Sequence, residues 1–345
     1  MSKSARRRST AKKKSAGAPT PPAAPPPRKR PLLLWGALAA VVVATIAGTI
    51  ILWPKPPGTE TGAASDGGPR LLAQVDSLYN DISVYRQANG LMMLTFGARR
   101  LNYVESIVNP KDELDLPVTY TQSMTAGLAY AATLTRAAII GLGGGRTAWY
   151  YHKSVPDLDF TAAELDPAVV QLAGQYFNVR PEQNFAIDVQ DGRVWLSKSD
   201  KDFDVFLIDA YRGPFVPFHL LTTEFYQLVA KHLRPGGVAV QNVEPTTMLF
   251  DSAVATIKSA FAHVVFLRGQ GNIVILAYNG PEKDEETLRR QATERTGQYH
   301  LRYDLTAILD RRFTPAWNDQ TKPLTDDFAP VEYLKAVARH NEKQS

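Results

Sequence analysis

The sequence predicts an α/β protein in which a small β-rich domain and a Rossmann-like domain follow one transmembrane helix. Three observations predict this fold class. From residue 137 onward, apolar runs of strand length alternate with helical segments. A glycine-rich turn, 141–145, ends the first of these runs. Near the N-terminus, residues 32–53 form a stretch without a charge.

The composition is that of a globular protein, with 44% hydrophobic and 21% charged residues in a chain of 345. The chain contains no cysteine, which excludes disulfides, thiolate metal sites and a cysteine nucleophile. Its six histidines show no metal-ligand spacing such as HExxH, so no metal is expected.

The net charge of +5 comes from a basic tail, residues 1–31. Residues 1–30 hold ten Lys and Arg and no acid, so the rest of the chain is mildly acidic. A tail rich in Ser, Ala and Pro is expected to be disordered. Because it lacks interleaved aromatic residues, we expect it to set membrane topology and contact anionic lipids rather than bind nucleic acid.

Residues 32–53 are predicted to form a transmembrane helix. At about 1.5 Å per residue the stretch reaches roughly 33 Å, and Trp35 and Trp53 lie near its ends. A cleaved signal peptide would have a shorter apolar region, and a core helix would have a polar face. The positive charge of the tail places the N-terminus on the cytoplasmic side of the cell membrane. Residues 54–70, rich in Pro and Gly, are predicted to be a flexible linker.

The small β-rich domain is predicted over 71–122. Within it, 81–85 and 91–96 have the alternation or apolar character of strands, and Asn89-Gly90 between them is typical of a hairpin turn.

The Rossmann-like domain is predicted over 123–345. Its alternation favours a mostly parallel sheet with helices on both faces, in which ligands bind at the carboxyl ends of the strands. The expected strands are 137–142, 158–165, 184–189, 203–210, 238–243 and 272–279. The expected helices are 166–177, 222–233 (ending before Arg234-Pro235-Gly236-Gly237) and about 246–261.

The glycine turn indicates a nucleoside site. Gly141, Gly143 and Gly145 follow a strand and open a helix, where glycine lets the backbone approach a ligand. The dinucleotide fingerprint needs a further glycine at the position of Arg146. The turn therefore favours a single nucleoside over a dinucleotide.

Two acidic positions are expected to complete this site. Glu164 ends the second strand, where a carboxylate can accept hydrogen bonds from both ribose hydroxyls. Asp191 and Gly192 follow the third strand and are placed to meet the adenine edge. A solvated acid at Glu164 and a helix cap at Asp191 are the structural alternatives.

Asp209 is the candidate catalytic residue. It ends the fourth strand, where a carboxylate can orient an amine or take its proton, although it could also cap the next loop. Residues 212–217 are expected to form a loop over the pocket, and His219 is either a second base or a structural residue of this loop.

These residues together resemble the spermidine synthase (polyamine aminopropyltransferase) family, from about residue 77 to 334. The motifs that carry the resemblance are 77–85, Tyr103-Val104-Glu105, Glu164-Leu165-Asp166-Pro167, Asp191-Gly192-Arg193 and 204–209. The resemblance implies the Rossmann-like S-adenosylmethionine-dependent methyltransferase fold and decarboxylated S-adenosylmethionine or S-adenosylmethionine as co-substrate. It also implies that Asn80, Tyr103 and Tyr211 contact the substrate, and it suggests a homodimer.

The chain is most similar to a membrane-associated branch of spermidine synthase-like proteins, through 141–145, 216–220 and 324–330. It departs from the true synthases at three positions. Arg146 and Arg212 stand where the family has Asp residues that hold the amine, and Asn80 replaces a Gln. Arginines facing the cleft would repel a cationic acceptor.

Three functions follow as hypotheses. The first is aminopropyl transfer from the decarboxylated cofactor to an amine, as in polyamine biosynthesis. The second is a methyltransferase with a non-polyamine acceptor, which Arg146 and Arg212 favour. The third is a membrane-tethered binding module without catalysis. The side of the membrane is left open, because the basic tail places the folded domain outside whereas such cofactors are made in the cytosol.

Overall fold

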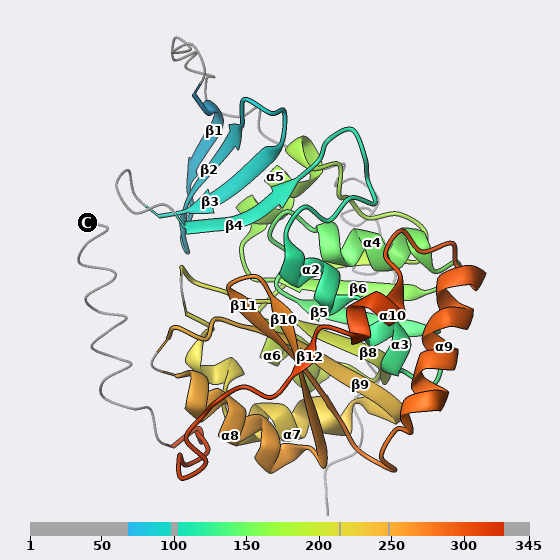
Figure 1. The fold of residues 1–345 in the computed structure, drawn as a ribbon. Helices are drawn as coiled ribbons and strands as arrows, with labels where there is room; N and C mark the ends of the chain where they lie inside the picture. The colour runs from blue at the N-terminus through green and yellow to red at the C-terminus, as the bar shows by residue number, and fades with distance from the viewer. Residues whose placement is uncertain (1–67, 98–102, 214, 248, 328–345) are drawn as a thin grey trace, which may run out of the picture. The chain divides into compact units, whose positions relative to one another are not determined.

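The computed structural model describes residues 68–97, 103–213, 215–247 and 249–327 (Figure 1). The predicted tail and transmembrane helix, 1–31 and 32–53, lie outside these residues, as does nearly all of the predicted linker. Within the described ranges, none of the helices is long and apolar enough to span a bilayer.

A small antiparallel sheet opens the described chain, with the strand order β1-β2-β3-β4. Its strands are β1 (Arg70–Asp76), β2 (Asp81–Arg86), β3 (Met92–Phe96) and β4 (Tyr103–Val108). The predicted hairpin is confirmed: β2 pairs antiparallel with β3, and Gly90 takes a φ of 86° in the turn. A positive φ of this kind costs glycine little.

The second sheet has eight strands in the described residues, in the order β12-β10-β11-β9-β8-β5-β6-β7. They are β5 (Arg136–Ile140), β6 (Asp159–Glu164), β7 (Phe185–Val189), β8 (Phe203–Ile208), β9 (Leu233–Val243), β10 (His263–Gly269), β11 (Asn272–Tyr278) and β12 (Arg312–Phe313). The run from β7 to β9 is parallel, which confirms the predicted α/β type. The other edge is antiparallel.

The antiparallel edge departs from the prediction. The sequence predicts a single late strand, 272–279, whereas β10 and β11 form a hairpin around Gln270 and Gly271. Only two residues separate β10 from the preceding helix, so its apolar run merges with the helical pattern. β12 is too short to be read from periodicity.

β9 also differs from its predicted bounds. The preceding helix ends at Lys231 and the strand begins at Leu233, so the Pro-Gly-Gly segment lies inside the strand. The register with β8 shifts there, and Gly236 has a φ of 80°. A glycine at such an irregularity lets a strand continue past residues that would otherwise end it.

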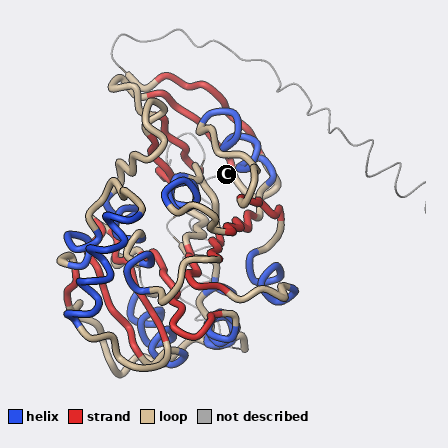
Figure 2. Tube along the Cα trace, turned by 90° about the vertical axis from the view of Figure 1, so that its right-hand side faces the viewer, coloured by secondary structure: helices blue, strands red, loops and turns tan. Residues whose placement is uncertain are grey.

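Helices cover both faces of the large sheet, as the side view of Figure 2 shows. They are α2 (Thr119–Met124), α3 (Gly127–Tyr130), α4 (Arg146–Ser154), α5 (Pro167–Tyr176), α6 (Gly192–Lys198), α7 (Thr223–Lys231), α8 (Phe250–Ala260), α9 (Glu285–Gln298) and α10 (Leu305–Leu309), with the short 3-10 helix η1 (Phe218–Leu220). The sequence predicts α5, α7 and α8, whereas α2, α3, α9 and α10 are not predicted.

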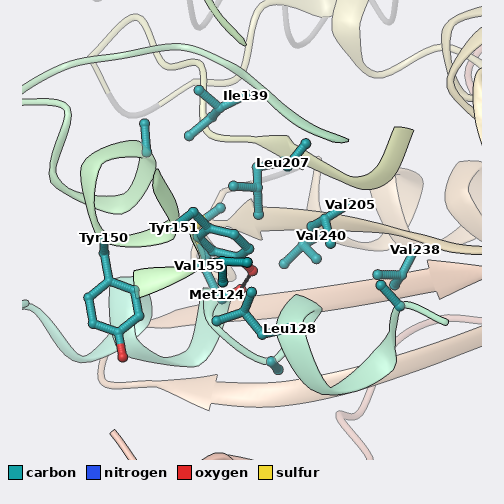
Figure 3. Packing of buried hydrophobic residues seen from close by; sticks show 14 of the residues in the cluster. Met124, Leu128, Ile139, Tyr150, Tyr151, Val155, Val205, Leu207, Val238 and Val240 are labelled. Atoms are coloured by element: carbon teal, nitrogen blue, oxygen red, sulfur yellow. Dashed lines mark hydrogen bonds between the residues drawn. The ribbon is translucent and has the colours of Figure 1, made fainter. Parts of the chain in front are cut away.

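Two apolar clusters hold these layers together. On one face, Tyr151 of α4 packs with Leu207 and Val240 of the sheet, as Figure 3 shows. On the other face, α6, α7 and α8 cover residues such as Phe206 and Ile275. β8 is buried along its whole length, which explains why it reads as a continuous apolar run.

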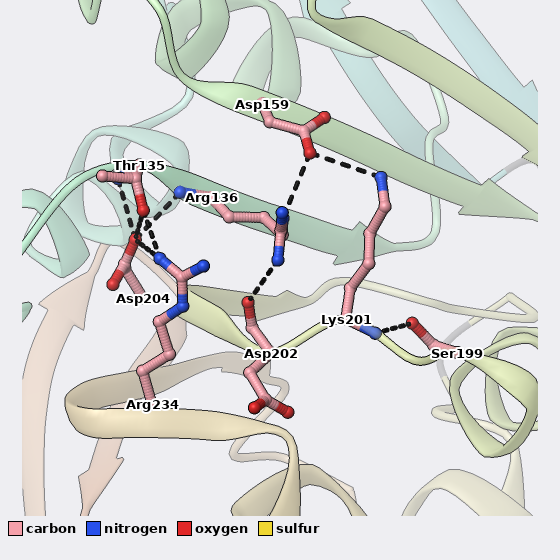
Figure 4. Close-up of polar contacts among 8 residues, drawn as sticks. All are labelled: Thr135, Arg136, Asp159, Ser199, Lys201, Asp202, Asp204 and Arg234. Carbon is pink, nitrogen blue, oxygen red and sulfur yellow. Dashed lines mark hydrogen bonds and ion pairs between the residues drawn. The ribbon is translucent and has the colours of Figure 1, made fainter.

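Polar contacts hold together the amino ends of β5, β6 and β8, at the end of the sheet away from the glycine turn (Figure 4). The buried carboxylate of Asp204 accepts hydrogen bonds from the backbone of Thr135 and Arg136, each at 2.8 Å. The Arg136 guanidinium in turn donates to Asp159 at 3.1 Å. These hydrogen bonds lower the pKa of Asp204 against the effect of its burial. The charged side chains at the amino ends of the strands therefore stabilise the fold. A ligand site is expected at the carboxyl ends instead.

Candidate functional site

A cavity lies at the carboxyl ends of β5, β6 and β8, where the small sheet meets the large one; we call it the first cavity. Its walls bring together most of the predicted site residues. Those that line it are Asn80, Gly141, Gly143, Glu164, Asp191, Gly192, Asp209 and Tyr211. Of the remaining predicted residues, Gly145 and Tyr103 do not line it.

The glycine turn is built as predicted, with positive φ at Gly141 (90°), Gly143 (52°) and Gly145 (72°). A Cβ atom at Gly141 would lie 2.6 Å from the carbonyl oxygen of Asp209, so glycine lets the turn lie against the end of β8. Gly145 is the N-cap of α4, and a Cβ there would meet Val179 at 2.6 Å. Its conformation shapes the turn, although it lies behind the cavity wall.

Glu164 is held by the backbone at the tip of β6. Its Oε2 accepts a hydrogen bond from the Leu142 N–H at 2.8 Å, and its Oε1 accepts one from the Asp166 N–H at 3.0 Å. Burial raises the pKa of Glu164 despite these bonds. The carboxylate therefore ties the glycine turn to β6 while it faces the first cavity.

Asp191 both lines the first cavity and caps a helix, so the two alternatives considered from the sequence do not exclude each other. It caps α6 by accepting from the Val194 N–H at 2.9 Å, and it also accepts a hydrogen bond from His219 Nε2 at 2.8 Å. The His219 bond is the main cause of a lowered Asp191 pKa. A Cβ at the neighbouring Gly192 would lie 2.2 Å from Ile140, so this glycine is needed for packing as well.

Asp209 is fixed from two sides. Asn242 donates to its Oδ1 at 2.9 Å, and Tyr120 donates to its Oδ2 at 3.4 Å. Asn272 donates to the Asn242 side chain at 2.9 Å, which extends the chain of hydrogen bonds. Burial raises the pKa of Asp209 to about 7, against the lowering effect of its two donors.

A second cavity adjoins the first, and the two share Glu105, Ser106, Tyr120 and Tyr211 in their walls. The predicted substrate residue Tyr103 lies here, whereas Asn80 lies in the first cavity. The second cavity also contains Glu244, whose Oε1 accepts from the Thr246 hydroxyl at 2.7 Å. The described residues that line it include no Lys, Arg or His.

Glu105 stands at the boundary of the two cavities. Its Oε1 is shielded from solvent and has no hydrogen-bond partner among the described residues. Burial, and secondly the charges of Asp209 and Glu164, raise the pKa of Glu105 to about 8. A buried carboxyl without a partner is costly, and such groups concentrate at functional sites.

The two arginines expected at the acceptor side lie differently. The Arg146 guanidinium is buried behind the turn, where it donates to the Glu113 carbonyl at 3.1 Å. Arg146 lines neither the first nor the second cavity but a smaller third one, so it does not meet the condition for repulsion, which is a guanidinium that faces the cleft. Arg212 lines the first cavity and is exposed. Among the described residues that line the two cavities, Arg212 is the one Lys or Arg side chain.

Three contributors to the site are not among the residues predicted for it. Glu105 occurs in the motif Tyr103-Val104-Glu105, where it is the extra residue of a β-bulge between β3 and β4. Tyr120 and Asn242 carry no local signal, because α2 is short and Asn242 lies within an apolar strand. Within the described ranges, no three His, Asp or Glu side chains are arranged to hold a metal ion.

Comparison with known proteins gives a consistent result. Residues 122–272 match the model of the spermine/spermidine synthase domain. The chain is 29% identical over 285 residues to the polyamine aminopropyltransferase of Vibrio vulnificus, covering 79% of this chain and 93% of that protein. It is 29% identical over 281 residues to a probable polyamine aminopropyl transferase of Bifidobacterium longum, covering 75% of this chain and 61% of that protein.

Solved structures agree in fold. The spermidine synthase of Thermotoga maritima matches with a TM-score of 0.59 at 20% identity, over 71% of this chain and 85% of that chain. The likeness supports the predicted Rossmann-like fold of the methyltransferase type. The resemblance to a membrane-associated branch stays a prediction.

Proposed function

Because residues 122–272 carry a domain of the spermine/spermidine synthase family, we propose that this chain is an aminopropyltransferase. The first cavity takes decarboxylated S-adenosylmethionine, and the second takes the amine that receives the aminopropyl group in polyamine biosynthesis. The two cavities share part of their walls, so the two reactants meet near Asp209.

The acidity of the second cavity is the observation that carries this proposal. Glu105 and Glu244 line it, and Tyr120 and Asn242 connect it to Asp209 through hydrogen bonds. No basic side chain lies among the described residues of its wall. Acidic groups in a partly dry cleft attract a cation several times more strongly than they would in water. A cationic amine is therefore the acceptor that this cavity favours.

The same acids favour the decarboxylated cofactor. S-adenosylmethionine itself carries a carboxylate at the end of the chain attached to its sulfonium. That carboxylate would face Glu105 and Asp209, and a negative charge there opposes the ionisation of both acids, whereas a cation favours it. The decarboxylated form lacks the carboxylate and keeps the ammonium group. Glu164 would accept hydrogen bonds from the ribose hydroxyls and Asp191 would lie near the adenine.

The reaction is a nucleophilic displacement. The amine nitrogen attacks the carbon next to the sulfonium, the carbon–sulfur bond breaks, and its electron pair stays on sulfur in the leaving methylthioadenosine. Asp209, held by Asn242 and Tyr120, accepts an N–H of the attacking amine and aligns its lone pair. The alternative of a methyltransferase is not favoured, because relatives that align over most of both chains are aminopropyltransferases.

Incubation of the full chain in detergent with labelled decarboxylated S-adenosylmethionine and a panel of amines tests this function. We expect transfer to diamines and none of the methyl group of S-adenosylmethionine. Asp209→Asn should lower kcat by about 100-fold or more, because the neutral amide cannot accept the N–H as a charged group does. Methyl transfer by the wild type, or no transfer from either compound, contradicts the proposal.

Binding of methylthioadenosine tests the nucleoside half by itself. Glu164→Ala should abolish the heat of binding in calorimetry, since it removes the ribose partner and frees the turn from β6. Glu294→Ala, an exposed acid on α9, is the matched control and should bind normally. Equal binding by both variants would remove Glu164 from the site.

A further inference from the structure

Glu105 reaches the boundary of both cavities because of its place on β4. Val104, Glu105 and Ser106 all line the second cavity, and Glu105 is the extra residue of a β-bulge, because Leu94 pairs with Ser106 and Thr95 pairs with Val104. Glu105 also lines the first cavity. Its carboxyl group is therefore placed where the acceptor nitrogen and the cofactor's reactive carbon would meet.

The other acids near this point have partners. Both oxygens of Asp209 accept side-chain hydrogen bonds, and both oxygens of Glu164 accept backbone ones. The Oε1 atom of Glu105 has none among the described residues, although it is shielded from solvent. The titratable groups that act on Glu105 or are acted on by it are Asp209, Glu164, Tyr120 and Tyr211. This oxygen therefore lacks a donor, and a bound ligand that donates a proton or a hydrogen bond would supply one.

We propose that Glu105 is the proton acceptor of the reaction: it takes the proton from the acceptor's ammonium group, so that a free amine attacks the cofactor. The role rests on the proposed function. The N–H bond of the ammonium breaks and its electron pair stays on nitrogen, while the proton forms an O–H bond on Glu105. The nitrogen pair then forms the new carbon–nitrogen bond as the carbon–sulfur bond breaks. The released proton leaves from Glu105 with the products.

The division of labour between the two acids follows from their surroundings. Asp209 is held in one orientation by two donors, which suits it to align the nitrogen. Glu105 has a free oxygen, and burial raises its pKa to about 8. A base works best when its pKa lies near the working pH, because it must both take and release the proton. Arrival of a cationic amine lowers this pKa and ionises Glu105 as the acceptor binds.

The pH dependence of Glu105→Gln tests the role. At about pH 7 the acceptor is an ammonium ion, since its pKa is about 10.4 as in lysine, and it needs a base. We expect kcat/KM of the variant to fall by about 100-fold or more there. Near pH 10 free amine is abundant in solution, and the deficit should shrink to less than about tenfold. Binding of methylthioadenosine by the variant should equal that of the wild type.

Two further variants separate this role from general effects. Glu244→Gln removes a negative charge from the same cavity and should raise KM for the ammonium form of the amine without lowering kcat, whereas Glu105→Gln lowers kcat. Glu105→Asp keeps a carboxyl and should give a pH profile parallel to that of the wild type, which preserves the test if the Gln variant does not fold.

A deficit of Glu105→Gln that is the same at all pH values, or no deficit, overturns the role while the transferase function stands. A wild type that transfers no aminopropyl group to any amine overturns the proposed function, and this role falls with it.

Discussion

Glu105 illustrates at the level of one residue how a functional group lowers stability. Its pKa is raised from the ordinary 4.5 to about 8, chiefly by burial. In the unfolded chain the carboxyl ionises near pH 4.5, whereas in the folded protein it keeps its proton up to about pH 8. Between these values the folded state binds more protons than the unfolded state. The contribution of Glu105 to stability therefore falls as the pH rises through this window.

This linkage predicts that Glu105→Gln stabilises the protein in a pH-dependent way. Gln cannot ionise, so the variant does not show the decrease in the free energy of unfolding that the wild type shows above pH 4.5. The difference in the free energy of unfolding should increase between about pH 4.5 and 8, by at most about 1.4 kcal/mol per pH unit for one proton. Thermal or urea unfolding at several pH values measures it. A difference that does not change with pH would contradict the buried, protonated state of Glu105.

Asp166 shows how an element is tied to both sheets. It is buried, and its Oδ1 caps α5 by accepting from the Ala168 N–H at 2.9 Å. Its Oδ2 accepts from the Ser77 hydroxyl at 2.5 Å, which joins the loop after β1 to the start of the helix. Val169 and Leu172 of α5 then pack against the small sheet. α5 thus positions the strands that supply Glu105 and Tyr103.

Asp166→Ala is predicted to destabilise the protein more than the loss of a helix cap alone. A cap contributes about 1 kcal/mol, and the change also removes the hydrogen bond from the half-buried Ser77 hydroxyl, which keeps only the Asn80 carbonyl as an acceptor. Chemical unfolding of Asp166→Ala, Ser77→Ala and the double variant forms the required cycle. Asp284→Ala, which removes the exposed cap of α9, is the matched control and should cost only the cap. Additive effects in the cycle would show that Ser77 and Asp166 do not interact.

At the scale of the whole molecule, residues 32–53 remain a proposal as a membrane anchor. Their 22 residues carry no charge and follow a basic tail. The full chain should therefore sediment with membranes and resist extraction by carbonate, whereas a chain without residues 32–53 should appear in the supernatant. Recovery of the full chain in the supernatant would refute the anchor.

A reporter fused to the C-terminus then assigns the side of the membrane on which the folded part lies. Gel filtration in detergent tests the suggested homodimer.

Much of the fold follows from local patterns. The hairpin of β2 and β3, the capped start of α5 and the parallel core strands are each encoded within a dozen residues. The antiparallel edge is not, because the apolar run of β10 follows α8 after only two residues and merges with its pattern. β12 has two residues and is stabilised by pairing with β10, which is distant in the sequence. The early start of β9 likewise depends on its register with β8.

The glycine turn and the acids at the strand ends, Glu164, Asp191 and Asp209, are determined by the sequence itself. Strands place the residues that follow them at one edge of the sheet, so spacing alone predicts that these side chains gather around a nucleoside. Only the tertiary structure decided the acceptor side. The burial of Arg146 against Glu113 and the exposure of Glu105 to two cavities depend on contacts between segments far apart in the chain. Desolvation and charge pairing arise from such contacts, and no local pattern encodes them.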